Sequence, residues 1–208
     1  MKQGVFITFE GGEGAGKTTM IQRTHQWLLD RSFEVVLTRE PGGTEVAEQI
    51  RQIVLGVENN HLCATAELLL VFAARAQHLE ELVRPSLASG KLVLCDRFTD
   101  ATWAYQGGGR NMPRELIATL EQSVHGDLQP DLTLLLDVPV KTGMARAGGR
   151  SEADRIESES LAFFDRVRTT YLERAKNYPE RFVVVDAAMD TELVWQQIER
   201  ILQARLGT

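Results

Sequence analysis

Runs of consecutive apolar residues recur along the chain and are separated by longer amphipathic stretches. The runs cover residues 5–9, 34–38, 91–96, 132–137 and 181–186. Continuous rather than alternating apolar runs are typical of strands that a parallel sheet buries on both faces. The amphipathic stretches predict helices at residues 20–29, 45–55, 64–89 and 191–206, the third with a kink or break near Pro85. The pattern predicts an α/β fold, with a parallel sheet of about five strands covered by helices on both faces.

A glycine-rich stretch follows the first apolar run and leads into the first predicted helix. Residues 11–19 read GGEGAGKTT and fit the pattern G-x-x-x-x-G-K-[ST]. Between a strand and a helix, this pattern turns successive backbone N–H groups toward phosphate oxygens, its lysine reaches the β- and γ-phosphates, and its last hydroxyl binds Mg²⁺. We expect a nucleoside triphosphate to be held by Gly11, Gly12, Glu13, Gly14, Ala15, Gly16, Lys17, Thr18 and Thr19.

Carboxylates end several apolar runs, at the edge of an open α/β sheet where ligands bind. Asp96 ends one run and is followed directly by Arg97. A carboxylate at this place holds the Mg²⁺ shell in phosphate-binding-loop enzymes, and the arginine beside it would hold a second phosphate. Asp137 ends another run and is a competing candidate, although the turn that follows it favours a capping role. We expect Thr18 and Asp96 to be the Mg²⁺ ligands.

The segment from about residue 140 to 160 is charged and contains glycines, and it carries Arg146, Arg150 and Arg155. Phosphoryl transfer needs water to be excluded and the charge of the moving group to be neutralised, which an arginine-bearing lid would do. A solvated helical face with alternating charges is the alternative that the sequence leaves open.

Composition limits the possible partners and locations. A chain of 208 residues fits a single domain over residues 1–208, and the net charge of -6 argues against binding nucleic acid or a membrane surface. The first apolar run begins too early for a signal peptide, and no run of about 18 apolar residues occurs, so we expect a cytoplasmic protein. Cys63 and Cys95 are expected to be buried free thiols, and none of the four histidines has a predicted chemical role.

Several short motifs together resemble the thymidylate kinase family. In chain order they are FEG at residues 9–11, TREPGGT at 38–44, RAQH at 75–78, DRF at 96–98 with AYQG at 104–107, and DRIE at 154–157. They have the order and spacing of that family over residues 4–200. The resemblance implies a phosphate-binding-loop nucleoside monophosphate kinase with a short lid at about 140–160. It also implies a homodimer that uses ATP and Mg²⁺ to convert dTMP to dTDP, giving ADP, in dTTP synthesis.

The resemblance also implies which residues hold the phosphate and sugar of the acceptor. Arg97 and Arg39 would bind the 5′-phosphate of dTMP. Tyr105 would press against the sugar and select deoxyribose, since its ring excludes a 2′-hydroxyl. Glu13 would face the sugar 3′-hydroxyl and the metal.

For the base, the resemblance implies a hydrogen bond from Arg75 to thymine, with Thr102 and Gln106 lining the pocket. Many members carry a ring that stacks on thymine four residues before this arginine, where this chain has Val71. Phe72 is one residue later and shares a helix face with Arg75 at a spacing of three. We expect Phe72 to be the stacking ring.

The catalytic arginine has two possible origins in the family. One form has an arginine directly after the loop carboxylate, where this chain has Gly14. The resemblance therefore implies the bacterial form, whose arginine comes from the lid. With Lys17 and Arg97, the predicted catalytic residues are Arg150 and Arg155, and Arg146 is the third candidate.

Two alternatives to this function remain at the level of the sequence. A kinase for another nucleoside monophosphate or a deoxynucleoside would differ only in its acceptor pocket. A nucleotide-dependent switch ATPase is disfavoured, because no further domain and no evident residue for positioning an attacking water are present.

Overall fold

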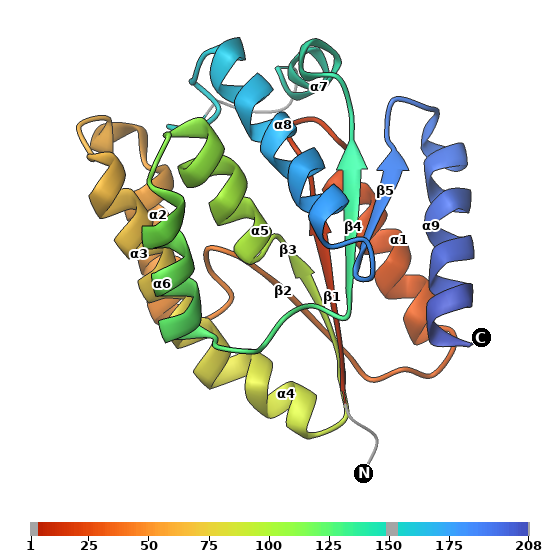
Figure 1. The fold of residues 1–208 in the computed structure, drawn as a ribbon. Coiled ribbons are helices and arrows are strands. Elements are labelled where there is room, and N and C mark those ends of the chain that lie inside the picture. Colours follow the sequence, from red (N-terminus) through yellow and green to blue (C-terminus); the bar gives the residue numbers. More distant parts are fainter. Residues whose placement is uncertain (1–3, 149–153, 208) are drawn as a thin grey trace.

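A five-stranded sheet in which every strand pair is parallel forms the centre of the computed structural model, which describes residues 4–148 and 154–207 (Figure 1). The strand order is β2-β3-β1-β4-β5. The strands are β1 (Val5–Glu10), β2 (Val35–Arg39), β3 (Leu92–Asp96), β4 (Leu132–Asp137) and β5 (Phe182–Asp186). Each agrees with its apolar run to within one residue at either end, so the predicted α/β fold with a parallel sheet is confirmed.

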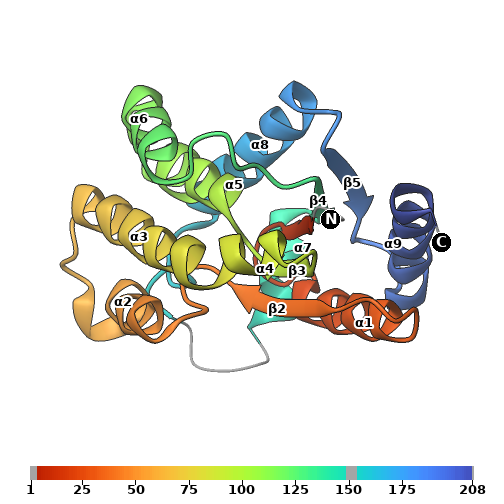
Figure 2. The same cartoon turned by 90° about the horizontal axis from the view of Figure 1, so that it is seen from below.

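Helices cover both faces of this sheet, as the sequence predicts. The regular helices are α1 (Lys17–Leu29), α2 (Glu45–Leu55), α3 (Ala64–His78), α4 (Arg84–Ala88), α5 (Thr99–Thr102), α6 (Arg114–Val124), α7 (Val140–Ala147), α8 (Leu161–Asn177) and α9 (Thr191–Leu206). Figures 1 and 2 show α1 and α9 together on one face, with α3 to α6 and α8 on the other. A short 3₁₀ turn, η1 (Val57–Asn59), follows α2, and π-helical turns occur at η2 (Leu79–Val83) and η3 (Trp103–Gly109).

The central strand β1 is buried on both of its faces. Ile7 and Phe9 pack under α1 and α9, while Phe6 packs with Val83 and Phe98 on the opposite side. Its one buried hydroxyl, on Thr8, is satisfied by the Thr133 hydroxyl of β4 at 3.0 Å. This two-sided burial explains why the strands read as continuous apolar runs.

The long helix predicted at residues 64–89 is interrupted earlier than expected. Regular α-helix ends at His78, and η2 separates it from α4. Pro85 lies in the first turn of α4, where its missing N–H needs no partner. The proline therefore marks the start of a new helix, and the geometry changes at the π turn before it. A second correction concerns the thiols, since Cys95 is buried but Cys63 is exposed just before α3.

The strand order places the site. After β1 the chain moves to one side of it for β2 and β3, and then to the other side for β4 and β5. A crevice forms at the carboxyl end of the strand where this reversal occurs. The register pairs Phe9 and Arg39 with Asp96, which brings the ends of β1, β2 and β3 to one level. In residues 4–148 and 154–207, no helix is long and apolar enough to cross a membrane.

Candidate active site

The phosphate-binding loop joins β1 to α1 at the crevice. Gly16, with φ 86°, is the N-cap, and α1 begins at Lys17. The Lys17 ammonium donates to the carbonyl oxygens of Gly11, at 3.1 Å, and Gly12, at 2.9 Å. Burial lowers the pKa of Lys17 from its usual value, and the charge of Arg97 lowers it further. A helix N-terminus and a buried cation thus point at one space, as a triphosphate requires.

The loop also packs against α7, which is the first helix of the predicted lid segment. Gly14 has φ 66°, and a Cβ placed there would overlap the carbonyl oxygen of Gly143 in α7. A Cβ at Gly143 would in turn overlap the carbonyl oxygen of Glu13. The absence of an arginine at position 14 therefore has a steric reason, because no side chain fits between the loop and α7.

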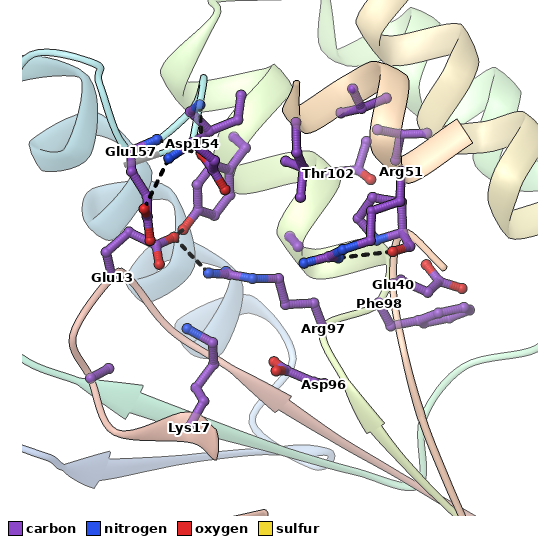
Figure 3. A pocket seen from close by; sticks show the side chains of 18 of the residues that line it. Glu13, Lys17, Glu40, Arg51, Asp96, Arg97, Phe98, Thr102, Asp154 and Glu157 are labelled. Atoms are coloured by element: carbon purple, nitrogen blue, oxygen red, sulfur yellow. Dashed lines mark hydrogen bonds and ion pairs between the residues drawn. The ribbon is translucent and has the colours of Figure 1, made fainter. Parts of the chain in front are cut away.

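A cavity of about 320 Å³ opens beside the loop (Figure 3). Its wall combines the phosphate loop with the segment after β2, helices α2 and α3, the segment after β3, and residues 154–157. Among the polar residues that line it are Glu13, Lys17, Thr18, Glu40, Arg51, Arg75, Asp96, Arg97, Thr102, Tyr105, Gln106, Asp154 and Glu157. The triphosphate loop and a second, arginine-lined space are thus parts of one cavity.

Arg97 lies between these two parts. It has φ 68°, a left-handed conformation that is costly for a residue with a side chain and is common at functional sites. Its guanidinium donates to Glu13 at 2.7 Å and to the Gly11 carbonyl at 2.9 Å (Figure 3). The Tyr105 hydroxyl also donates to Glu13, at 2.7 Å. Burial raises the pKa of Glu13, but the charges of Arg97 and Lys17 outweigh burial and bring the pKa to about 2.

Glu10 supports Arg97 from beneath. Its buried carboxyl group accepts from the backbone N–H of Phe98 at 2.8 Å, and the Tyr171 hydroxyl lies 2.7 Å from its other oxygen. Burial and the charge of Asp100 raise the pKa of Glu10 to about 8. Glu10 therefore holds the strained backbone of Arg97 in place through the neighbouring residue, Phe98.

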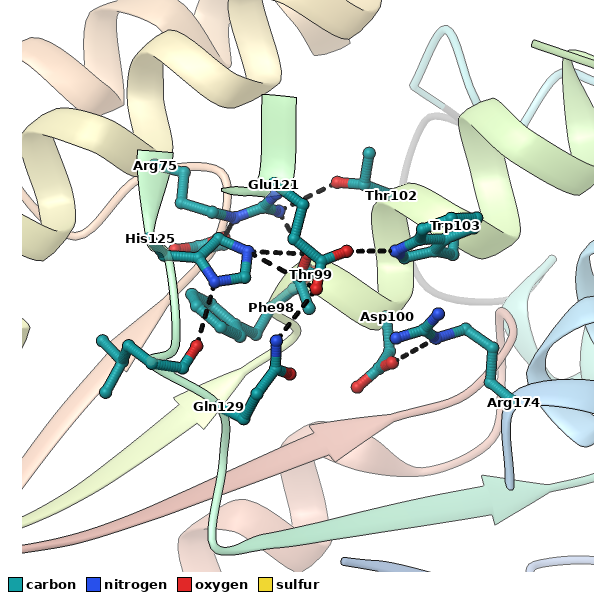
Figure 4. A network of polar contacts seen from close by, with 12 residues as sticks. Arg75, Phe98, Thr99, Asp100, Thr102, Trp103, Glu121, His125, Gln129 and Arg174 are labelled. Carbon is teal, nitrogen blue, oxygen red and sulfur yellow. Dashed lines mark hydrogen bonds and ion pairs between the residues drawn. The ribbon is translucent and has the colours of Figure 1, made fainter. Parts of the chain in front are cut away.

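Arg75 enters the cavity from α3. Its Nη2 atom donates to the Thr102 hydroxyl at 2.9 Å and to the Phe98 carbonyl at 3.1 Å (Figure 4). Its Nε atom donates to Glu40 at 2.7 Å. The buried Nη1 atom has no hydrogen-bond partner among residues 4–148 and 154–207. A planar guanidinium held at two nitrogens presents its third in one direction.

The two predicted metal ligands both line the cavity. The Oδ1 atom of Asp96 is buried and has no partner in the part of the chain that the structure describes. Thr18 is exposed at the start of α1. Within the described ranges, no cluster of three or more carboxylate, histidine or cysteine side chains could hold a metal by itself. Mg²⁺ suits such a place, because it keeps several waters and is bound by one or two protein ligands together with substrate phosphates.

Known proteins of one kind match this chain over nearly all of its length. A family model described as thymidylate kinase matches residues 9–198. The chain belongs to the thymidylate kinase family. A thymidylate kinase of Pseudomonas putida (strain GB-1) is 54% identical over 199 residues, covering 96% of this chain and 95% of the relative. One of Alcanivorax borkumensis is 54% identical over 200 residues, covering 96% of each.

A solved thymidylate kinase shares the fold. The crystal structure of the enzyme from Ehrlichia chaffeensis matches with a TM-score of 0.79 at 34% identity, covering 97% of this chain and 99% of that one. The expected phosphate-binding-loop nucleoside monophosphate kinase architecture is thereby confirmed.

Two of the residues that the thymidylate kinase resemblance singled out lie outside the cavity wall. The Arg39 side chain is 53% exposed and pairs with Glu48 at 2.8 Å. Phe72 packs in a core cluster with Leu68 and Ile117, and Val71 lines the cavity in its place. Positions 71 and 72 both neighbour Arg75, at spacings of four and three, but packing turns Val71 toward the cavity and Phe72 toward the core. The Phe72 ring instead packs on the Arg75 guanidinium, whose Cζ atom lies 4.9 Å from the centroid of the ring.

Two of the expected lid arginines, Arg146 and Arg155, do not line the thymidylate kinase cavity. Arg155 is buried and donates to the Val54 carbonyl at 2.8 Å and to Glu67 at 2.5 Å. Arg146 donates to the carbonyl of Ala187 at 2.7 Å. Arg150 lies outside the described residues. The competing metal candidate, Asp137, is occupied by a bidentate pair with Arg168 at 2.7 and 2.8 Å.

The structure also brings in residues that the sequence did not single out. Arg51 reaches the cavity from α2 and donates to the Pro41 carbonyl at 2.9 Å. Glu40, Asp154 and Glu157 line the cavity as well. The last three stand inside the TREPGGT and DRIE motifs, so the thymidylate kinase motifs marked their positions without giving them roles. Arg51 has no such signal, since it is one charged residue of an amphipathic helix.

Proposed function

We propose that the chain transfers the γ-phosphoryl group of ATP to thymidine 5′-monophosphate, giving dTDP and ADP, as a step in dTTP synthesis. The observation that carries this function is the continuity of the cavity, which runs from Lys17 of the phosphate loop past Arg97 to Arg75. A donor phosphate and an acceptor nucleotide can therefore occupy one continuous space. The relatives over nearly the whole chain are thymidylate kinases, which supports dTMP as the acceptor.

In this mechanism the protein positions two phosphates and neutralises charge. Lys17 and the loop N–H groups hold the β- and γ-phosphates of ATP. Arg97 holds the phosphate of dTMP, which replaces part of its present pairing with Glu13. Because Glu13 stays ionised throughout the neutral range, it remains an acceptor for the Tyr105 hydroxyl and the sugar. Thr18 and Asp96 would hold Mg²⁺, which when bound neutralises phosphate charge.

The acceptor nucleotide extends from Arg97 toward α3. Tyr105 lies beside its sugar, and Arg75, Thr102 and Gln106 surround its base. The free Nη1 group of Arg75 suits a base carbonyl. Arg51, which also lines the cavity, takes the place near the acceptor phosphate that the sequence assigned to Arg39.

The two predicted lid arginines have different roles in this proposal. Arg155 is buried against Glu67, so it ties the segment after the lid to α3. Arg150 remains the candidate for the transferred phosphoryl group, on the sequence alone. The proposed lid, residues 140–160, begins with α7, which already packs against the phosphate loop at Gly14.

A coupled ADP-release assay with dTMP, dUMP, CMP, GMP and no acceptor tests the function. We expect dTMP to give the highest kcat/KM and the reaction without acceptor to be slow. Equal ADP release without any acceptor would favour a switch ATPase. A preference for CMP or GMP would favour another nucleoside monophosphate kinase.

We further propose a cytoplasmic homodimer. Helix α3 exposes Leu69, Ala73 and Ala76 at spacings of four and three, which form one apolar stripe. Ile53 of α2 and Val57 of η1 are also exposed. A second copy packed on this stripe would bury it. Light scattering tests the dimer, and Leu69→Glu should yield a monomer while the matched change Leu193→Glu on α9 should not.

A further inference from the structure

A buried line of hydrogen bonds runs behind the cavity, from β2 across α3 to Arg75. The Thr38 hydroxyl and His78 Nε2 are 2.7 Å apart. His78 Nδ1 and one oxygen of Glu40 are 2.9 Å apart. The other oxygen of Glu40 accepts from Arg75 Nε at 2.7 Å. The side chains of His78, Arg75 and Glu40 are 0%, 1% and 2% exposed, and only Glu40 and Arg75 reach the cavity.

The charge of Glu40 fixes the direction of the two bonds that it makes. Burial raises the pKa of Glu40, but the charge of Arg75 and the bond to His78 outweigh burial, so the pKa is lowered. An ionised carboxylate only accepts, so His78 must donate from Nδ1. The second ring nitrogen, Nε2, is then left for the hydrogen bond with the Thr38 hydroxyl. Both oxygens of Glu40 are therefore occupied, which fixes the plane of the carboxylate.

The backbone around His78 is shaped to hold it. Gly43 has φ 88°, and a Cβ there would lie only 2.7 Å from His78 Nε2. The chain after Glu40 therefore passes directly over the imidazole. His78 thus joins the loop that carries Glu40 to the helix that carries Arg75.

The line ends at a donor group without a partner among the described residues. The Nε and Nη2 atoms of Arg75 are bonded, and its buried Nη1 atom is without a partner in residues 4–148 and 154–207. A buried donor without an acceptor is costly, so a bound ligand that supplies a carbonyl oxygen gains from meeting it. The direction of Nη1 depends on Glu40, because the guanidinium is rigid.

We propose that His78 is a positioning residue for the acceptor base. Through Glu40 it aims the free Nη1 group of Arg75 at a carbonyl oxygen of the base, and it thereby disfavours a base with an amino group at that point. The identity of the base rests on the proposed function. His78 touches neither the substrate nor the reacting atoms.

Two substitutions separate the two bonds of the imidazole. An asparagine amide can lie near the place of Nδ1, so His78→Asn keeps the donor to Glu40 and loses the contact with Thr38. A glutamine amide reaches the place of Nε2, so His78→Gln keeps the contact with Thr38 and loses the donor to Glu40. His61, which is exposed, provides the matched controls His61→Asn and His61→Gln.

The experiment measures kcat and KM for dTMP, dCMP and ATP in all four variants and the unaltered enzyme, with a thermal melt of each. In His78→Gln we expect KM for dTMP to rise about tenfold, and the preference for dTMP over dCMP to fall about tenfold, since about one hydrogen bond to a charged group is lost. KM for ATP should stay within about twofold, and His78→Asn should recover most of the loss. The His61 variants should match the unaltered enzyme.

An unchanged KM for dTMP in a folded His78→Gln enzyme would overturn the proposal. Equal losses for dTMP and ATP, or equal losses in His78→Asn and His78→Gln, would overturn it too, because they indicate a general packing defect. Should His78→Gln not fold, Thr38→Val replaces only the hydroxyl with a methyl group and should raise KM for dTMP about threefold. If the unaltered enzyme does not use dTMP, the proposed function fails, and the same comparison is made with the acceptor that it does use.

Discussion

The two sides of the active site are built in different ways. The triphosphate side is one continuous stretch of backbone, residues 11–18, at the N-terminus of α1. The acceptor side is assembled from side chains of α2, α3, η3 and the segment after β3. Each of its key side chains is held by a carboxylate: Arg97 by Glu13, Arg75 by Glu40, and Gln106 by Glu67.

This difference indicates how each side depends on its residues. A backbone cradle needs glycines and one cation, so its function is concentrated in a few neighbouring positions. A side-chain pocket with buried ion pairs depends also on residues that never touch the substrate, because removing one partner leaves a buried charge unpaired. Substitutions on the two sides should therefore have distinct kinetic signatures.

Lys17→Ala should give the largest effect. Removing the cation that faces the transferred phosphates should lower kcat about 10³-fold. KM for dTMP should change by no more than about twofold, because the side chain belongs to the triphosphate side. The coupled assay at saturating substrates measures this, and a variant that keeps a tenth of the normal kcat would contradict the role.

Arg97→Ala should act on the other side. It should raise KM for dTMP about 100-fold, since the acceptor phosphate loses a charge-assisted bidentate partner. Arg39→Ala is the matched control, because Arg39 lies outside the cavity wall and pairs with Glu48. A large rise in KM for the control as well would restore the assignment made from the sequence, in which Arg39 holds the phosphate together with Arg97. An unchanged KM in Arg97→Ala would contradict the role of Arg97.

Arg155→Ala should affect stability more than chemistry. Glu67 would lose one of its partners while keeping Arg110 and Gln106, so the free energy of unfolding should fall by about 2 kcal/mol. Arg150→Ala should instead lower kcat with the unfolding free energy unchanged. Urea unfolding and initial rates distinguish the two, and a reversed pattern would make Arg155 the catalytic arginine.

Glu10→Gln should change the pH dependence of stability. The pKa of Glu10 is about 8 in the folded chain and near 4.5 when exposed, so the folded state binds the proton more tightly. The contribution of Glu10 is then complete below pH 4.5 and is lost as the pH rises toward about 8. In urea unfolding, the free energy of unfolding of Glu10→Gln should rise relative to that of the unaltered chain between pH 5 and pH 9. A constant difference across that range would contradict the raised pKa.

How much the sequence could predict follows the same division. The strands and the phosphate loop are local patterns, and both are found where the sequence places them. On the acceptor side the motifs identify Arg75, Arg97 and Tyr105, which line the cavity. The expectation for Phe72 goes against the structure, because a one-residue shift on a helix turns the side chain by about 100° and only tertiary packing selects the face.

Hydrogen-bonded pairs between residues that are far apart in the chain could not be predicted from the sequence. Arg155 meets Glu67, 88 positions away, and this pair removes it from the cavity wall. His78 meets Glu40, 38 positions away. The four histidines are scattered along the chain, so nothing in the sequence indicates this contact. A charged residue gives no local sign of its partner when packing alone brings the two together.

Crossed binding titrations test the division between the two sides most directly. Calorimetry would give Kd for ATP and for dTMP in Lys17→Ala and in Arg97→Ala. Lys17→Ala should lose affinity for ATP by about tenfold or more and keep its affinity for dTMP within about twofold, and Arg97→Ala should show the reverse. Equal weakening of both ligands in either folded variant would contradict an active site made of two separately built halves.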